Sequence, residues 1–362
     1  MQKYGKRAAN DNKPTLTTLA SDGYPSDCRR KSHEKNFFLI LLAISIMLGV
    51  SVLPSQAASS SRFLSVPTPY DDGTNWKGKT HQATHPSIVQ FDEKWHGYNY
   101  WMAFTPYPYE NDQTENPCIV ASNDGIHWQV PAGVSNPLVP TPKKGLHSYN
   151  SDVHLFYNRS TSRLELWYRE LAKMTKDSSQ EMLYRITSSD GKDWTDPEAM
   201  TAAMGDKLQL ISPSIVFEDG IYKMWLMRDW YVLYSESADG KNWGPFSAIT
   251  ANGKAIHSWH PDVMKIDGVY YLLNLNRKNR EDVGGELSYS TSADGIHFTA
   301  EKHLLSNTGK KTDPDGYRIY RSSMILEPDG VQLYYGQTSF DNQWTLGSTT
   351  GRSLEALAEH KK

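Results

Sequence analysis

The sequence predicts an all-β fold, a five-bladed β-propeller with four-stranded antiparallel blades. Three observations lead to this prediction. A short apolar strand with a polar start occurs five times, a Ser-x-Asp-Gly turn recurs between these strands, and no stretch beyond the N-terminal region shows helical periodicity. Repeats of this size, each with several short strands, are typical of propellers, in which each repeat forms one small sheet.

The repeated strand begins near residues 85, 150, 212, 260 and 321, so successive starts are 65, 62, 48 and 61 residues apart. Each interval has room for about four short strands, the content of one blade. A turn, often Asp-Gly, and a strand rich in aromatic residues follow, which is a strong hairpin signal. The five segments read HPSIVQF from His85, NSDVHLF from Asn150, SPSIVFEDGIYKMWL from Ser212, HPDVMKIDGVYYLL from His260 and RSSMILEPDGVQLYY from Arg321.

The recurring turn has the form S-x-D-G-x-x-W/F. We expect its aspartate to bond the backbone of the turn while the aromatic residue packs behind it, so these aspartates are assigned to structure. The last repeat lacks a full turn, and we expect residues 63–66 to supply a strand to that blade and close the ring. The four turns run from Ser122 to Trp128, Ser188 to Trp194, Ser237 to Trp243 and Ser292 to Phe298, with aspartates Asp124, Asp190, Asp239 and Asp294.

The N-terminal region predicts export. Residues 1–35 are polar, basic residues precede the uncharged run 37–53, and small residues follow it. This pattern is typical of a signal peptide cleaved after Ala57, and the alternative is an uncleaved anchor formed by residues 37–53. The predicted organisation is therefore a cytoplasmic n-region with signal peptide or anchor (1–57), a linker with the ring-closing strand (58–80), the propeller (81–352) and a C-terminal tail (353–362).

Composition and motifs limit the kinds of ligand and cofactor that the chain is expected to bind. A net charge of −3 and a pI near 6.5 give no electrostatic footprint for nucleic acid. The two cysteines, Cys28 and Cys118, imply no disulfide framework. No nucleotide-binding or H-E-x-x-H motif occurs, and no histidine spacing requires a metal, so no cofactor is predicted; a calcium ion on the axis would be compatible with the fold. We expect a secreted monomer with a carbohydrate ligand, in contact with a membrane only through an uncleaved N-terminal segment.

These motifs resemble those of the five-bladed glycoside hydrolases of families 43, 32, 62 and 68. The Pro-Ser/Asp-Ile/Val strand, the Asp-Gly-x-Tyr continuation and the turns carry the resemblance over about residues 85–350. The turn also resembles the Asp-box of sialidases, shortened by one residue. The resemblance implies the propeller fold and a carbohydrate substrate, although propellers host many functions.

The sequence departs from the family 43 pattern at the positions that matter for catalysis. His85 stands where the family has an aspartate that resembles a general base, and Ser212 stands where an aspartate tunes the pKa of a partner. A Glu-Gly-Pro acid motif is absent, whereas residues 259–263 are close to the family's Trp-Ala-Pro-Asp-Val. The usual carboxylates therefore do not transfer to this chain, which has either relocated acids or no catalytic activity.

Strand alternation gives a second route to the site, because residues i and i+2 of a strand share a face. On the first strand of each repeat one face is polar throughout, and we expect this face to line a central funnel. The alternative is a water-filled, hydrogen-bonded axis. The ten residues are His85 and Ser87, Asn150 and Asp152, Ser212 and Ser214, His260 and Asp262, and Arg321 and Ser323. The second strands and their loops add Tyr107, Glu115, Arg169, Glu170, Arg228, Asp229, Asn276, Arg277 and Gln337.

Glycoside hydrolysis needs one protonated and one ionised carboxyl group. We expect Asp152 and Asp262 deep in the funnel, Glu170 or Glu115 as acid at the rim, and Asp229 as a further candidate. The arginines suit an anionic sugar or neighbouring acids. Trp101, Trp230 and Trp259 either stack on sugar rings or pack between blades. The predicted substrate-binding residues are His85, His260, Arg169, Arg228, Arg277, Arg321, Trp259 and Tyr107.

The sequence therefore predicts an exported glycoside hydrolase-like enzyme that acts on a polysaccharide or oligosaccharide. A non-catalytic, lectin-like propeller is the main alternative, and a protein-binding scaffold is the third. Carboxylates that are all paired with arginines would favour the lectin.

Overall fold

The computed structural model describes residues 62–70, 81–203, 209–276 and 285–359. The predicted signal segment, its cleavage site and Arg277 lie outside these residues. Within the described ranges, no helix combines the length and the hydropathy needed to cross a membrane.

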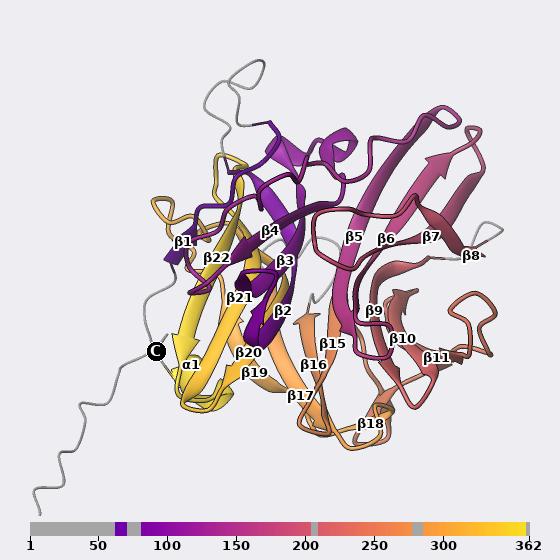
Figure 1. The fold of residues 1–362 in the computed structure, drawn as a ribbon. Helices are drawn as coiled ribbons and strands as arrows, with labels where there is room; N and C mark the ends of the chain where they lie inside the picture. Colours follow the sequence, from indigo (N-terminus) through magenta and orange to yellow (C-terminus); the bar gives the residue numbers. More distant parts are fainter. Residues whose placement is uncertain (1–61, 71–80, 204–208, 277–284, 360–362) are drawn as a thin grey trace, which may run out of the picture. The chain divides into compact units, whose positions relative to one another are not determined.

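The fold is an all-β propeller built from small sheets that follow one another along the chain (Figure 1). Five sheets are antiparallel meanders, ordered β2-β3-β4, β5-β6-β7-β8, β9-β10-β11-β12, β15-β16-β17-β19 and β20-β21-β22-β1. Their strands are β1 (Arg62–Leu64), β2 (Ala83–Trp95), β3 (Tyr98–Pro106), β4 (Cys118–Ser122), β5 (His147–Asn158), β6 (Arg163–Lys173), β7 (Ser179–Ser188), β8 (Glu198–Ala203), β9 (Ile211–Glu218), β10 (Ile221–Arg228), β11 (Tyr231–Ser237), β12 (Ser247–Ala248), β15 (Pro261–Ile266), β16 (Val269–Asn276), β17 (Glu286–Ser292), β19 (Lys302–Ser306), β20 (Arg318–Glu327), β21 (Gly330–Thr338) and β22 (Trp344–Gly351).

The prediction of five four-stranded blades was wrong in number and in size. The described residues form six sheets of three or four strands. The sixth sheet consists of the two-residue strands β13 (Thr250–Ala251), β14 (Lys254–Ala255) and β18 (His297–Phe298), and its β13–β18 pair is parallel. Strands this short leave no alternation in the sequence, which is why the repeat pattern missed them.

The first strands of the five larger sheets surround a common axis. Strand β2 contacts β5 and β20, β9 contacts β5 and β15, and β15 contacts β20, so the contacts close on themselves. Strand β1 pairs with β22 and joins the N-terminal end of the described chain to the last sheet. A ring closed in this way leaves the sheets only short, protected strand edges.

Each recurring turn fastens its own sheet to the sheet before it. The four turn aspartates accept backbone N–H bonds within the turn, as the sequence predicts; Asp190, for example, accepts them from Lys192 and Asp193, both at 2.8 Å. The glycine that follows each aspartate lies in the left-handed region and sits so close to an aromatic side chain of the neighbouring sheet that an added Cβ would have no room. The four contacts are Gly125–Tyr334, Gly191–Trp101, Gly240–Trp167 and Gly295–Trp225.

The last sheet has no such turn, and a short helix takes its place. Helix α1 (Leu354–Glu359) buries Leu354 and Leu357 in the apolar cluster between the fourth and last large sheets, and Tyr289 donates a hydrogen bond to Glu355 at 2.5 Å. No helix was predicted here, because six residues are too few to show a 3.6-residue period. Two single 3₁₀ turns, Pro108–Glu110 and Asp112–Thr114, connect β3 to β4.

We expect Gly191→Ala to destabilise the fold strongly, because a Cβ there would lie 2.1 Å from the Trp101 ring. Gly268→Ala is the matched control, since Gly268 is also left-handed (φ 80° against 75°) but has nothing within 4 Å of an added Cβ. The left-handed backbone costs alanine about 1–2 kcal/mol at both sites. Overpacking should add about 1–3 kcal/mol at Gly191 alone. Urea unfolding measures both, and equal losses would contradict the interlocked turns.

Candidate functional site

The candidate site lies where three inner strands have β-bulges at corresponding positions along the strands. Strands β2, β5 and β9 lose register with their neighbours at His85, Asp152 and Ser212, and each of these residues adopts a left-handed backbone with φ of 54°, 53° and 49°. Such a conformation is costly for a residue with a side chain, and bulges re-aim side chains next to functional sites. Three strands therefore turn a polar side chain toward the axis at one height.

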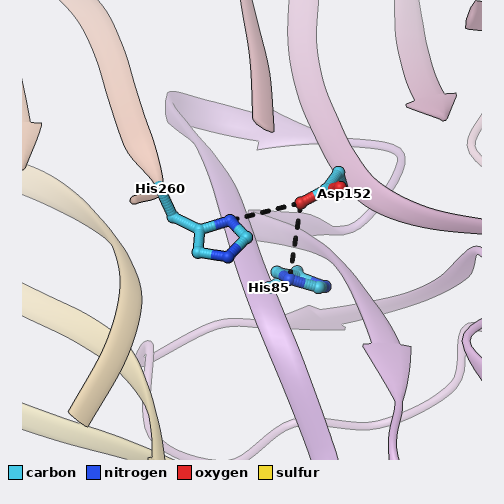
Figure 2. Close-up of side chains that lie close together, drawn as sticks. All are labelled: His85, Asp152 and His260. Carbon is cyan, nitrogen blue, oxygen red and sulfur yellow. Dashed lines mark ion pairs between the residues drawn. The ribbon is translucent and has the colours of Figure 1, made fainter. Parts of the chain in front are cut away.

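Asp152 lies at the centre of the resulting cluster, between two histidine rings (Figure 2). Its Oδ1 lies 3.5 Å from His85 Nε2 and 3.4 Å from His260 Nδ1. Ser212 donates a hydrogen bond to the same oxygen at 2.9 Å. All four side chains are buried although they come from four different strands or strand ends.

The cluster combines an ionised carboxylate with two neutral imidazoles. Burial is the main reason that the pKa of His85 falls to about 3 and that the pKa of His260 is lowered. Burial alone would raise the pKa of Asp152, but its hydrogen bond to His260 and the charge of the Arg169 guanidinium hold that pKa well below its usual value. Arg169 lies 3.3 Å from Asp152 Oδ2 and supplies the compensating charge.

Three donor atoms of this cluster fit a divalent metal ion. The ligand atoms of His85, Asp152 and His260 all lie within 4.8 Å of one another, and His85 Nε2 is buried without a hydrogen-bond partner. Donors about 2.1 Å from a tetrahedral metal lie about 3.4 Å apart, close to the two distances from Asp152. In metal sites the ring nitrogen that does not bind the metal forms a hydrogen bond that fixes the orientation of the imidazole. Here Thr105 contacts His85 Nδ1 at 3.0 Å, and Tyr320 contacts His260 Nε2.

Glu115 is a further carboxyl group in contact with this cluster. Burial first of all, and then the charge of Asp152, raises its pKa well above the usual value. Among the described residues its one ion-pair contact is His85 Nδ1, at 3.7 Å. The site therefore has one ionised carboxylate, Asp152, and one carboxyl group that tends to stay protonated.

Asp262, the other predicted catalytic aspartate, belongs to a separate buried cluster. It accepts hydrogen bonds from Arg321 at 3.3 Å and Ser214 at 3.1 Å, and His154 Nδ1 lies 3.5 Å away. Arg321 is fully buried and also donates to the carbonyl oxygens of Val153 and Pro213. This guanidinium ties β20 to β5, β9 and β15 and fills the axis next to the first cluster.

Of the ten polar residues expected to line one funnel, three line a cavity in the described part of the chain. A cavity of about 1640 Å³ opens among the inner strands on the side of Ser87, Asp262 and Ser323, which line it. His85, Asp152 and His260 precede the lining residues of β2, β5 and β15, respectively, and are not among them. Strict alternation failed because the bulges insert residues and reset the face of the strand.

The other predicted site residues lie around the first cluster or away from it. Arg169 bridges Asp152 and Glu181, and Glu170 is paired with Lys144 at 2.7 Å. Asp229 is exposed on the β10–β11 turn next to Arg228, whose guanidinium stacks on Phe246. Trp259 packs edge-on against His260, whereas Tyr107 packs against Trp344 and Trp101 is a core residue.

Sequence reasoning missed the contacts that unite these residues. Lys144, Glu181, Tyr320 and His154 were not assigned to the site, yet each contacts one of its charged or ligand-type residues. His85, Ser212 and His260 each precede a proline, which favours an extended backbone at the preceding residue, yet His85 and Ser212 are left-handed. The sequence therefore carries no local signal for these two bulges.

The fold is similar to that of solved glycoside hydrolases. A solved RS223-β-xylosidase superimposes with a TM-score of 0.55 at 11% identity, covering 80% of this chain and 94% of that one. No family model matches the sequence.

Greater similarity is found to a deacetylase. A curated protein of Flavonifractor plautii, "A type blood N-acetyl-alpha-D-galactosamine deacetylase", is 28% identical over 385 residues, which cover 88% of this chain and 50% of that protein. The chain thus spans about half the length of this curated relative. The crystal structure of an N-acetylgalactosamine deacetylase from F. plautii, in complex with blood group B trisaccharide, gives a TM-score of 0.68 at 24% identity and covers 82% of this chain and 96% of that one.

Arg321→Met should destabilise the fold by about 3–5 kcal/mol, because it leaves the buried Asp262 carboxylate without its cation. Adding Asp262→Asn should restore part of the loss, since the uncompensated charge is then gone. Arg159→Met, at an exposed arginine, serves as the control and should change the free energy of unfolding by less than about 0.5 kcal/mol. A double variant no more stable than Arg321→Met would argue against this charge pairing.

The metal-free protein should lose stability as the pH falls below about 6.5, where unfolded histidine binds a proton. Folded His85 takes up its proton only near pH 3, so the unfolded state binds more protons between these values and acid favours unfolding. Thermal unfolding from pH 7 to pH 4 measures the slope, which His85→Gln should reduce. An unchanged slope in this variant would show that His85 does not remain neutral.

Proposed function

We propose that this chain is a metal-dependent carbohydrate deacetylase that hydrolyses the acetamido group of an N-acetylhexosamine in a glycan. The observation that carries the proposal is the buried cluster of His85, Asp152 and His260, an N,N,O donor set with two neutral imidazoles and an ionised carboxylate. The similarity to the F. plautii deacetylase over 88% of the chain supports the reaction and the N-acetylgalactosamine type of substrate.

In this reaction water adds to the amide carbonyl carbon, the C–N bond breaks, and acetate and the sugar amine are formed. A divalent ion held by the three donors would polarise the carbonyl oxygen and lower the pKa of water. Thr105 and Tyr320 fix the orientation of the two imidazoles, and Arg169 keeps Asp152 ionised. Glu115, in its protonated form, would deliver a proton to the departing nitrogen, a role suited to a carboxyl group with a raised pKa.

Glycoside hydrolysis by paired carboxylates is the second candidate. The opposite tendencies of Glu115 and Asp152, one protonated and one ionised, are what such a mechanism requires. The other predicted acids favour it less, because Asp262 is paired with Arg321 and Glu170 with Lys144. In either case we expect an exported protein with the N-terminal signal segment that the sequence predicts.

The test is release of acetate from glycans that end in N-acetylgalactosamine or N-acetylglucosamine, before and after treatment with EDTA. We expect EDTA to abolish release, and Zn²⁺ or Mn²⁺ to restore it. Asp152→Asn should lose both bound metal and activity. Glu115→Gln should keep the metal, measured by elemental analysis, but lose about 10²–10⁴-fold in kcat.

Asp190→Asn is the matched control, because it makes the same chemical change in a turn and keeps an acceptor oxygen there; it should retain both metal and activity. Reducing-end release that resists EDTA, with no acetate, would replace the proposal by glycoside hydrolysis. Glycan binding without either product would favour the lectin.

A further inference from the structure

A pair of tryptophans extends outward from the cluster. The rings of Trp230 and Trp259 lie 4.8 Å apart at 34°, and Trp259 meets the His260 ring at 5.3 Å and 87°. Both tryptophans are partly exposed. The core tryptophans are at most 2% exposed, and they are Trp101, Trp167, Trp225 and Trp344. The pair is therefore a partly exposed aromatic surface next to a proposed metal ligand.

The backbone of Trp230 is strained to hold this surface. Asp229 and Trp230 form the two-residue turn between β10 and β11, with φ of 50° and 71°. This turn type strongly prefers Asn-Gly, and a left-handed backbone costs other residues about 1–2 kcal/mol. Strain of this kind persists where the surroundings enforce it, and it is concentrated at functional sites.

Hydrogen bonds from the segment that leads to His260 hold the turn in place. Ser258 N–H donates to the carbonyl oxygen of Trp230 at 3.0 Å, and Tyr231 forms a backbone bridge with His257. Trp259 donates from its indole nitrogen to Tyr320 at 3.3 Å, and from its backbone to Leu275. These bonds fix the backbone of Trp230 and the ring of Trp259, and the Trp230 ring packs against Trp259, before any ligand arrives. Such preorganisation lowers the entropic cost of binding.

We propose that Trp230 and Trp259 form a platform for the pyranose ring adjoining the N-acetylated residue, so that the protein acts on oligosaccharides in preference to monosaccharides. The inference rests on the proposed function and names a sugar subsite for it. The indole faces offer apolar area to the C–H groups of a pyranose. Their contact with His260 joins the platform to the reacting centre, and their partial exposure keeps it open to a ligand.

Trp230→Ala tests the platform without changing a residue that contacts the cluster. The substrates are methyl N-acetyl-α-galactosaminide and an oligosaccharide in which N-acetylgalactosamine is α-linked to galactose. We expect the variant to lose at least tenfold more kcat/KM on the oligosaccharide than on the methyl glycoside, mainly through KM, because only the oligosaccharide reaches the platform. Trp230→Phe should recover most of the loss, since it restores an aromatic face.

Trp95→Ala is the matched control, a partly buried tryptophan at the far end of β2 that stacks on Phe91; it should not change the ratio between the two substrates. An equal loss on both substrates, or no loss, in Trp230→Ala would overturn the platform.

If the wild-type protein releases no acetate, the proposed function fails and the platform is tested by binding alone. Saturation-transfer NMR with galactobiose is then the measurement. Contact with the disaccharide that Trp230→Ala abolishes would support the platform independently of any activity. Contact that persists in the variant, or no contact with the wild type, would overturn it.

Discussion

The burial of an ionised carboxylate on the propeller axis is the constraint on which the rest of the structure depends. Removing Asp152 from water is costly unless its charge is compensated and its oxygens are hydrogen-bonded. Arg169 supplies the charge, Ser212 donates a bond, and two neutral imidazoles occupy the remaining side. Arg169 belongs to the same sheet as Asp152, whereas His85, Ser212 and His260 come from three other inner strands or strand ends. The complete set of contacts around the carboxylate therefore exists only while the sheets keep their positions around the axis.

The interlocked turns provide that rigidity at a distance from the axis. Each turn glycine lies close to an aromatic side chain of the preceding sheet, and five apolar clusters fill the spaces between neighbouring large sheets. On the axis itself, Arg321 reaches across to three other inner strands. Peripheral packing and the axial guanidinium together allow His85, Asp152 and Ser212 to keep left-handed backbones that isolated strands would relax.

The parts of the fold that could be predicted are those with local causes. Asp219-Gly220 and Asp267-Gly268 form the expected hairpins, and the four turns form because serine, aspartate and glycine fix them within a few residues. The ligand set could not be predicted, because bulges at His85 and Asp152 break the alternation used to assign faces. Helix α1 and the sixth sheet were not predicted, because elements of two to six residues are too short to show a periodic pattern of apolar side chains.

The geometry of the cluster explains what the histidine at position 85, which departs from the family 43 pattern, does chemically. An aspartate at position 85 would place a second carboxylate beside Asp152, and two buried carboxylates so close together could not both stay ionised. With histidine there, the same bulge contributes a neutral nitrogen whose Nε2 faces Asp152. On the proposed function, His85 thereby adds a nitrogen donor to the carboxylate oxygen of Asp152. The side chains at the bulges then set the chemistry of this chain, while the interlocked sheets hold them in place.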